Sequence, residues 1–185
     1  MSPGRFALSI LLMLAAGLAA AEADPWAVLQ QGGNVLLIRH AATEFGVGDP
    51  PSFRLDDCST QRNLTDAGRA DARRLGEILR SRGARITAAR SSQWCRCLET
   101  AQLAFGRAEP WSALNSIFRD ASREAEQNRA VLELAATVKP PANIALVGHS
   151  HNIRSLVGIT PSQLEIVIAR YEDGGLKVVG RIPPP

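Results

Sequence analysis

Two apolar runs, far apart in the chain, each end at a histidine. The run at residues 35–38 is followed by Arg39 and His40, and the run at residues 143–148 is followed by His149. Runs of this length, rich in Val, Ile and Leu, predict strands buried on both faces, as in a parallel sheet covered by helices. Ligands bind such sheets at the carboxyl ends of the strands, so we expect both histidines at one ligand-binding edge.

Helical and extended patterns alternate along the rest of the chain. Capped or amphipathic stretches predict helices at 26–31, 65–83, 94–105, 123–138 and 153–157, and strands are predicted at 34–39, 86–90 and 143–148. Residues 45–60 are predicted to form a long loop, and 164–170 with 176–182 a hairpin. The segment 111–118 is ambiguous and is interpreted as a strand end followed by a loop. This order predicts an α/β fold, a three-layer αβα sandwich with a mostly parallel central sheet.

The first 23 residues have the pattern of a cleavable signal peptide. Arg5 precedes an apolar stretch from Phe6 to Leu18, and Ala21 and Ala23 lie at the small-residue positions that signal peptidase reads. The apolar stretch is shorter than the ~20 residues that cross a bilayer. We therefore expect cleavage after Ala23, a periplasmic or secreted location, and no stable membrane insertion after processing.

The remaining residues, 24–185, are enough for one domain and too few for two ordinary ones. The formal net charge is +3, the basic residues are scattered, and aromatic residues make up only 5% of the chain. A nucleic-acid-binding surface needs clustered basic residues or a stacking platform, so no nucleic-acid partner is expected. The excess of arginine is a weak indication of an anionic ligand.

The chain contains three cysteines, Cys58, Cys95 and Cys97. In an exported protein a disulfide is expected, and an odd number leaves one thiol unpaired. Cys95 and Cys97 are too close in sequence for a comfortable bridge to each other, so we predict a bond between Cys58 and Cys95, with Cys97 as a small buried apolar residue. The Cys-x-Cys pair lacks a second pair of ligands at zinc spacing.

Arginine and histidine converge at the predicted ligand-binding edge. Ser91 and Ser92 follow the third strand, and Arg96 lies about one helical turn further on. If the three strands are neighbours, Arg39, His40, Arg96 and His149 surround one pocket. Two guanidinium groups and two imidazoles suit a phosphoryl group, whose transfer depends on positioning and on neutralising its oxygens.

Four segments resemble the motifs of one known family. Residues 37–44, Leu-Ile-Arg-His-Ala-Ala-Thr-Glu, are similar to the Arg-His-Gly signature of the histidine phosphatase superfamily, in its phosphoglycerate-mutase-like branch. The segments Asn63–Gly68, Ser91–Ala101 and Val147–Ser150 agree with that family in order and together extend the resemblance from about residue 35 to residue 156. The resemblance implies a phosphoglycerate-mutase-like fold and a phosphoric monoester hydrolase.

The resemblance also implies roles for particular residues. His40 would be the nucleophile that becomes phosphohistidine, while Arg39, Arg96 and His149 would hold the phosphoryl oxygens; neither a metal nor a cofactor is implied. A neutral imidazole can attack phosphorus if its other nitrogen donates to a backbone carbonyl. Further candidates for contact with phosphate or substrate are Thr43, Glu44, Gln61, Arg62 and His151.

The departing alkoxide needs a proton donor, and the sequence leaves its identity open among four carboxyl groups. The candidates are Asp120, Glu124, Glu126 and Glu44, of which we prefer Asp120 because it lies nearest the end of the ambiguous segment 111–118. The short segment between Arg96 and His149 has no room for a large cap, so an open pocket is expected. The expected partner is a phosphorylated small-molecule or envelope substrate; the oligomeric state is left open.

Two residues depart from the family pattern. Ala41 stands where the family has glycine, and Ser150 follows His149 where glycine is frequent. A methyl group at position 41 could obstruct the close approach of backbone to phosphate. An alternative to the enzyme is therefore a phosphate-binding or phosphosugar-binding module that uses the same pocket without turnover. A zinc site at His149 and His151 lacks the supporting ligands of a metallohydrolase.

Overall fold

A computed structural model of the protein describes residues 23–46 and 48–185. Residues 1–22 of the expected signal peptide therefore lie outside the described residues. None of the helices in the described part of the chain is long and apolar enough to cross a membrane.

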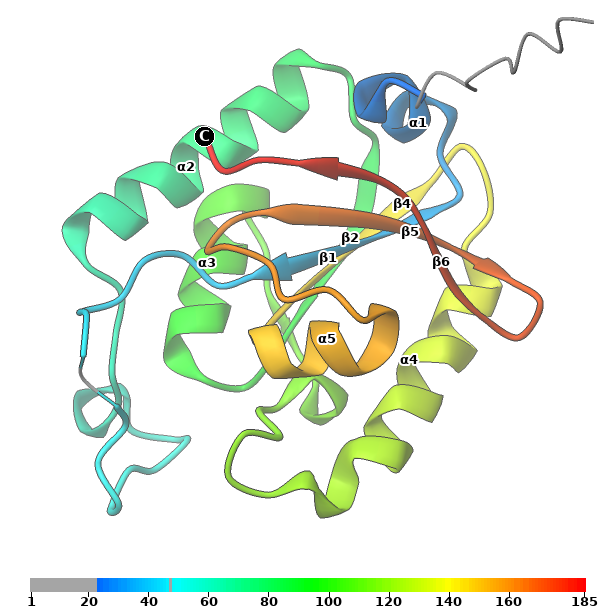
Figure 1. Cartoon of the computed structure of the whole chain (residues 1–185). Helices are drawn as coiled ribbons and strands as arrows, with labels where there is room; N and C mark the ends of the chain where they lie inside the picture. Colours follow the sequence, from blue (N-terminus) through cyan, green and yellow to red (C-terminus); the bar gives the residue numbers. More distant parts are fainter. Residues whose placement is uncertain (1–22, 47) are drawn as a thin grey trace, which may run out of the picture.

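A six-stranded mixed sheet forms the centre of the described molecule, in the order β3-β2-β4-β1-β5-β6 (Figure 1). Its strands are β1 (Asn34–Arg39), β2 (Ile86–Ser91), β3 (Glu109–Pro110), β4 (Asn143–Gly148), β5 (Ile166–Glu172) and β6 (Gly175–Ile182). The first four are parallel to one another, and β5 and β6 extend the sheet as an antiparallel hairpin beside β1. Arg39 pairs with Gly148 in the register of β1 and β4, which brings the two histidines that follow them together.

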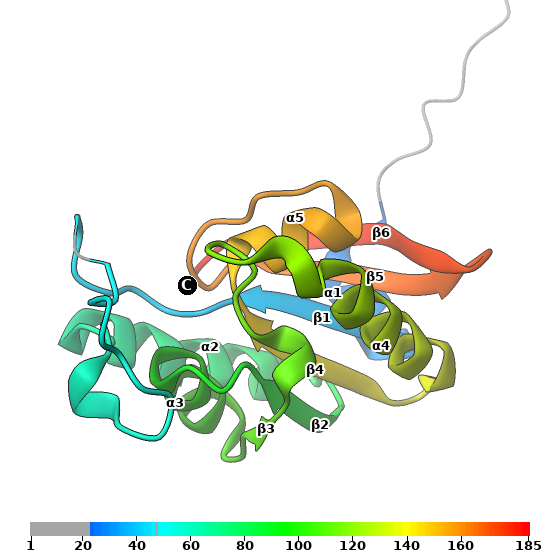
Figure 2. The ribbon, with the colours of Figure 1, turned by 90° about the horizontal axis from the view of Figure 1, so that it is seen from below.

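Helices cover both faces of the sheet (Figures 1 and 2). They are α1 (Pro25–Gln31), α2 (Asp66–Ser81), α3 (Cys95–Phe105), α4 (Glu124–Thr137) and α5 (Ser150–Val157). Because side chains alternate along a strand, Leu36 and Ile38 of β1 pack with α1, α2 and α3, whereas Val35 and Leu37 pack with α4 and α5. The predicted three-layer sandwich is confirmed.

The predicted start of α2 agrees with the structure, whereas the start of α5 and the segment around residue 110 differ from the prediction. The side chain of Thr65 accepts a hydrogen bond from the Gly68 amide, so it caps α2 at the predicted start of this helix. Helix α5 begins at Ser150, three residues before the predicted start at 153. The prediction missed its first turn because that turn consists of polar residues, which carry no apolar periodicity. The ambiguous segment 111–118 holds a 3-10 turn at Ser112–Leu114, and the strand β3 lies just before it.

A disulfide joins Cys58 to Cys95, as predicted. It ties the loop at residues 45–60 to the first residue of α3. Cys97 is a free, buried thiol, also as predicted, and burial raises its pKa to about 12.

Candidate active site

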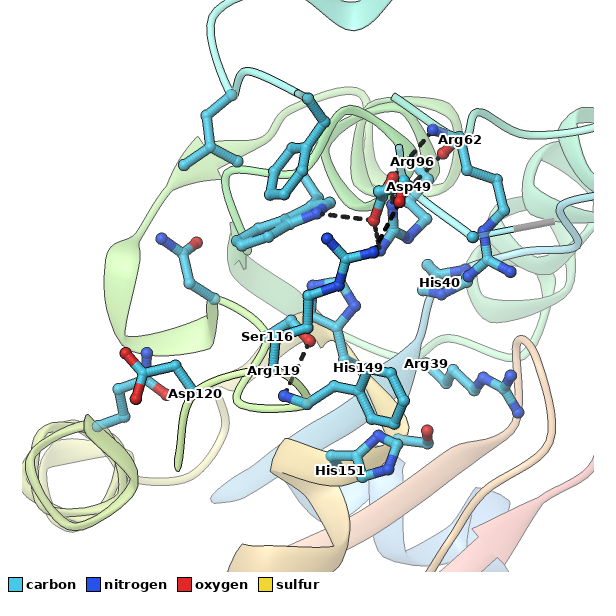
Figure 3. Close-up of a pocket in the computed structure, with 18 of the residues that line it drawn as sticks. Arg39, His40, Asp49, Arg62, Arg96, Ser116, Arg119, Asp120, His149 and His151 are labelled. Atoms are coloured by element: carbon cyan, nitrogen blue, oxygen red, sulfur yellow. Dashed lines mark hydrogen bonds and ion pairs between the residues drawn. The ribbon is translucent and has the colours of Figure 1, made fainter. Parts of the chain in front are cut away.

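A cavity of about 570 Å³ lies where β1, β2 and β4 end. Among its lining residues are Arg39 at the end of β1, His40 directly after it, and His149 directly after β4. The lining also includes two further arginines, Arg96 in the first turn of α3 and Arg62 in the loop before α2, which add positive charge to the cavity. The strands therefore bring these five predicted residues into one cavity (Figure 3).

His40 is buried, with only 3% of its surface exposed. Its Nδ1 lies 2.8 Å from the carbonyl oxygen of Ala41. A carbonyl can only accept, so Nδ1 carries the proton and the neutral ring keeps its lone pair on Nε2. Burial, reinforced by the positive charges of Arg96 and Arg39, lowers the pKa of His40 to about 3, although the Ala41 hydrogen bond acts in the opposite direction.

His149 lies beside His40, with the two ring centroids 5.6 Å apart in an edge-on arrangement. Its Nε2 lies 3.0 Å from the hydroxyl of Ser92 and 3.6 Å from the thiol of Cys97. Burial lowers the pKa of His149 well below its usual value, and the neighbouring His40 and the charge of Arg96 lower it further. Both rings are therefore neutral near pH 7.

Arg96 forms the best-buried ion pair of the site, with Asp49 from the long loop at residues 45–60. Its Nη1 donates to Oδ1 of Asp49 at 2.9 Å and its Nη2 donates to Oδ2 at 3.1 Å. The arginine side chain is 5% exposed and the aspartate side chain 13% exposed. The Nε of Arg96 is buried and has no hydrogen-bond partner among the described residues.

Arg39 approaches the cavity from the end of β1. Its Nη1 donates to the carbonyl oxygen of Pro161 at 3.2 Å, and its Nε is buried with no hydrogen-bond partner in the described part of the chain. Burial lowers the pKa of this guanidinium. A buried donor without an acceptor is unfavourable, and a bound oxyanion would supply the missing acceptor.

The segment after His40 is anchored to α3 and to the core. The amide of Ala41 donates to Oγ1 of Thr100 at 3.0 Å, and that hydroxyl donates to the carbonyl of Arg96 at 2.7 Å. Ala41 is fully buried within the apolar cluster beneath α2 and α3 and does not line the cavity. The methyl group at this position is thus accommodated by the core and leaves the phosphate space open.

Other predicted contact residues divide into those inside and outside this cavity. His151 lines it and packs on Phe118, with the ring centroids 4.7 Å apart. Glu44 and Gln61 line a neighbouring cavity instead. Gln61 also fixes the loop, because its side chain donates to the carbonyl of Arg54 and accepts from the amide of Cys95. Thr43 lines neither cavity; it forms a backbone bridge with Leu64.

Of the four candidate proton donors, Asp120 lines the cavity, whereas Glu44, Glu124 and Glu126 do not. Asp120 is exposed and caps the 3-10 turn Ala121–Arg123 by accepting from the amide of Ser122. Hydrogen bonds from Ser122 lower the pKa of Asp120. In Figure 3 its carboxylate lies on the opposite side of the pocket from His40.

Several lining residues had no signal in the sequence that pointed to the site. They are Asp49, Phe53, Asn115, Phe118, Arg119 and Arg123. Most of them come from irregular segments, where no apolar periodicity fixes the direction of a side chain, whereas Arg123 ends a 3-10 turn at the start of α4. Within residues 23–46 and 48–185, no three or more His, Cys, Asp or Glu side chains form a group that could hold a metal ion.

Comparison with known proteins gives one family match. The family model of the histidine phosphatase superfamily, branch 1, matches residues 35–125. No curated protein matches the sequence.

Solved structures share the fold at low sequence identity. The protein histidine phosphatase SixA complexed with tungstate is 16% identical with a TM-score of 0.58, covering 82% of this chain and 97% of that one. YhfR of Bacillus stearothermophilus is 18% identical with a TM-score of 0.58, covering 78% and 94%. The phosphoserine phosphatase of Entamoeba histolytica in complex with 3-phosphoglyceric acid is 15% identical with a TM-score of 0.57, covering 80% and 95%.

The match at residues 35–125 includes β1, His40 directly after it, and α3 with Arg96. The chain is therefore similar to the histidine phosphatase superfamily over residues 35–125, and it shares its fold with solved phosphatases.

Proposed function

We propose that this protein is an exported, metal-independent phosphomonoesterase that works through a phosphohistidine intermediate on small or envelope-associated phosphorylated substrates. The observation that carries the proposal is the state of His40. Its ring is buried, its Nδ1 donates to the Ala41 carbonyl, and its pKa is lowered to about 3. A nucleophile at Nε2 is thereby available at neutral pH in a cavity whose lining includes Arg39, Arg62 and Arg96.

The proposed reaction has two displacement steps at phosphorus. In the first, Nε2 of His40 forms a bond to phosphorus as the ester P–O bond breaks, and the leaving oxygen takes a proton. In the second, water attacks phosphorus and gives a proton to the group that protonated the leaving oxygen, the N–P bond breaks with its electron pair returning to Nε2 of His40, and inorganic phosphate leaves. Arg39, Arg62 and Arg96 neutralise the oxygens of the phosphoryl group, and His149 contributes a further polar contact.

We propose Asp120 as the group that protonates the leaving oxygen, because it is the candidate that lines the cavity. Its lowered pKa leaves little of the acid form at neutral pH, so the enzyme should favour esters whose leaving oxygen needs little protonation. Asp120→Asn should slow hydrolysis of an alkyl phosphate more than that of an aryl phosphate. Equal losses on both would count against this role.

The range of substrates is left broad. The solved structures with this fold include a protein histidine phosphatase and a phosphoserine phosphatase, so the fold accommodates both protein and small-molecule phosphates in those proteins. Export is supported by the leader pattern at residues 1–23 and by the Cys58–Cys95 disulfide. Sequencing the N-terminus of the secreted protein tests it; an intact Met1 would contradict cleavage.

The enzyme is tested with an aryl phosphate in excess chelator, using the wild-type protein and His40→Ala. We expect chelator-resistant hydrolysis that falls by about 10³-fold or more in the variant. Thermal unfolding of both proteins establishes that the variant is folded. Tight binding of inorganic phosphate without hydrolysis by the wild-type protein would instead support the non-catalytic binding module.

A further inference from the structure

We propose that Asp49 is a positioning residue for phosphoryl transfer, which holds the Arg96 guanidinium so that its remaining donors face the phosphoryl group. The inference rests on the proposed function, and it assigns a role to a loop residue outside the segments that carry the family resemblance. Asp49 lies within the loop that the Cys58–Cys95 disulfide ties to α3.

The Asp49 carboxylate is fixed by donors from three residues of the site. Arg96 donates to both oxygens, at 2.9 Å and 3.1 Å. The indole Nε1 of Trp94 donates to Oδ2 at 3.2 Å, and the backbone amide of Arg62 donates to Oδ1 at 2.9 Å. A carboxylate held in this way is a rigid anchor for the guanidinium rather than a mobile surface partner.

The pairing leaves one edge of the Arg96 guanidinium for a ligand. A guanidinium has five N–H donors, distributed over Nε, Nη1 and Nη2. Asp49 takes one from each terminal nitrogen, and the carbonyl of Arg62 lies 3.4 Å from Nη1. The Nε donor is buried without an acceptor among the described residues, and so is the Nε donor of Arg39 in the same cavity. A phosphoryl oxygen would satisfy them.

The negative charge of Asp49 also balances the positive charges of the arginines around it. Arg39, Arg62 and Arg96 line one cavity, and burial together with the charge of Arg96 lowers the pKa of Arg62. Burial alone would raise the pKa of Asp49, but hydrogen bonds from Arg96 and Arg62 lower it, so the carboxylate stays ionised. It offsets repulsion among the arginines before a substrate arrives. Arg119 further secures the loop by donating to the Asp49 carbonyl at 2.7 Å.

Binding of orthovanadate, a mimic of the pentacoordinate phosphoryl group, tests this role by isothermal titration calorimetry. Asp49→Asn keeps the size of the side chain but removes its charge, and we expect it to weaken vanadate binding about 10-fold or more. Asp49→Glu should recover part of the loss. Asp56→Ala is the matched control, because Asp56 lies in the same loop and pairs only with the exposed Arg54 among the interactions described.

The decisive comparison repeats Asp49→Asn in an Arg96→Ala background, where we expect no further loss of vanadate affinity. Equal losses in both backgrounds would overturn the proposal, because Asp49 would then act without Arg96. Tighter binding by Asp49→Asn would also overturn it, since the carboxylate would then compete with phosphate for Arg96. Vanadate binding needs no turnover, so this cycle decides the role of Asp49 even if the wild-type protein hydrolyses no phosphomonoester.

Discussion

His40 combines the properties that a nucleophilic imidazole needs, and each comes from its immediate surroundings. It follows a buried strand, so its ring is removed from water, and its Nδ1 reaches the carbonyl of the next residue. The same burial, with the charges of Arg96 and Arg39, lowers its pKa to about 3. The residue therefore stays in the unprotonated form across the whole neutral and mildly acidic range.

This lowered pKa predicts how the activity depends on pH. A histidine at the ordinary value of 6.5 gains a proton and loses its nucleophilic lone pair as the pH falls from 7 to 5, whereas a histidine with a pKa near 3 does not. We expect kcat/KM for an aryl phosphate, corrected for ionisation of the ester itself, to show no loss attributable to His40 above about pH 4. A loss centred near pH 6.5 would contradict the lowered pKa.

At the scale of residues, the sequence predicts the site residues that follow regular elements better than those that come from loops. Arg39, His40 and His149 are predictable because each lies at or just after the end of a strongly apolar strand, and Arg96 because it lies one turn into the helix after β2. Asp49 is not predictable in this way. Its position depends on a long irregular loop whose path is set by tertiary contacts, including a disulfide 37 residues apart in sequence.

At the scale of elements, helix α3 connects the core to the site. It carries Arg96 in its first turn and packs closely against α2, where Gly76 lies next to the backbone of Ala104. A Cβ atom at Gly76 would lie 2.1 Å from the carbonyl oxygen of Ala104. Glycine is therefore required here for the close approach of the two helices.

Gly76→Ala should consequently destabilise the protein, although alanine favours helix by up to about 1 kcal/mol. The cost of separating the two backbones is on the order of 1–3 kcal/mol and exceeds that gain. Urea unfolding checks the prediction. Gly175→Ala is the control, since a Cβ there would meet nothing within 4 Å, and it should change the free energy of unfolding far less. An increase in stability for Gly76→Ala would contradict the close packing.

The predicted elements agree with the structure wherever an apolar pattern is strong. The strands at 34–39 and 143–148 have the predicted bounds, because buried strands are read directly from apolar runs. The start of α5 and the two-residue strand β3 are missed, because polar residues in a first helical turn and a very short edge strand carry no periodic signal.

At the scale of the whole molecule, the Cys58–Cys95 bond links the loop that supplies Asp49 to the helix that supplies Arg96. Replacing both cysteines by serine opens a covalent link across 37 residues and should lower the free energy of unfolding by about 2–4 kcal/mol. It should also weaken vanadate binding, because the loop loses its anchor.

Urea unfolding of the double variant, and of wild-type protein with and without a reductant, measures this effect. The variant and the reduced wild-type protein should agree with each other. Unchanged stability in both would show that the loop is held by its other contacts alone, and it would weaken the argument for an oxidising location.

The overall architecture was predictable from the alternation of helical and extended patterns, whereas the exact shape of the pocket was not. The three-layer sandwich follows from the order of helices and strands, and each of these is predicted from its own local apolar pattern. The pocket depends on which irregular segments fold back over the ends of the strands, among them the loop with Asp49 and the segment with Phe118 and Arg119.

The central claim is that His40 becomes phosphorylated during turnover. Its most direct test is to mix the protein with an aryl phosphate, quench at alkaline pH, where phosphohistidine persists, and locate the added phosphoryl group by peptide mass spectrometry. We predict one phosphoryl group on His40, absent from His40→Ala. A phosphoryl group on another residue, or rapid hydrolysis by the His40→Ala variant, would contradict the proposed mechanism.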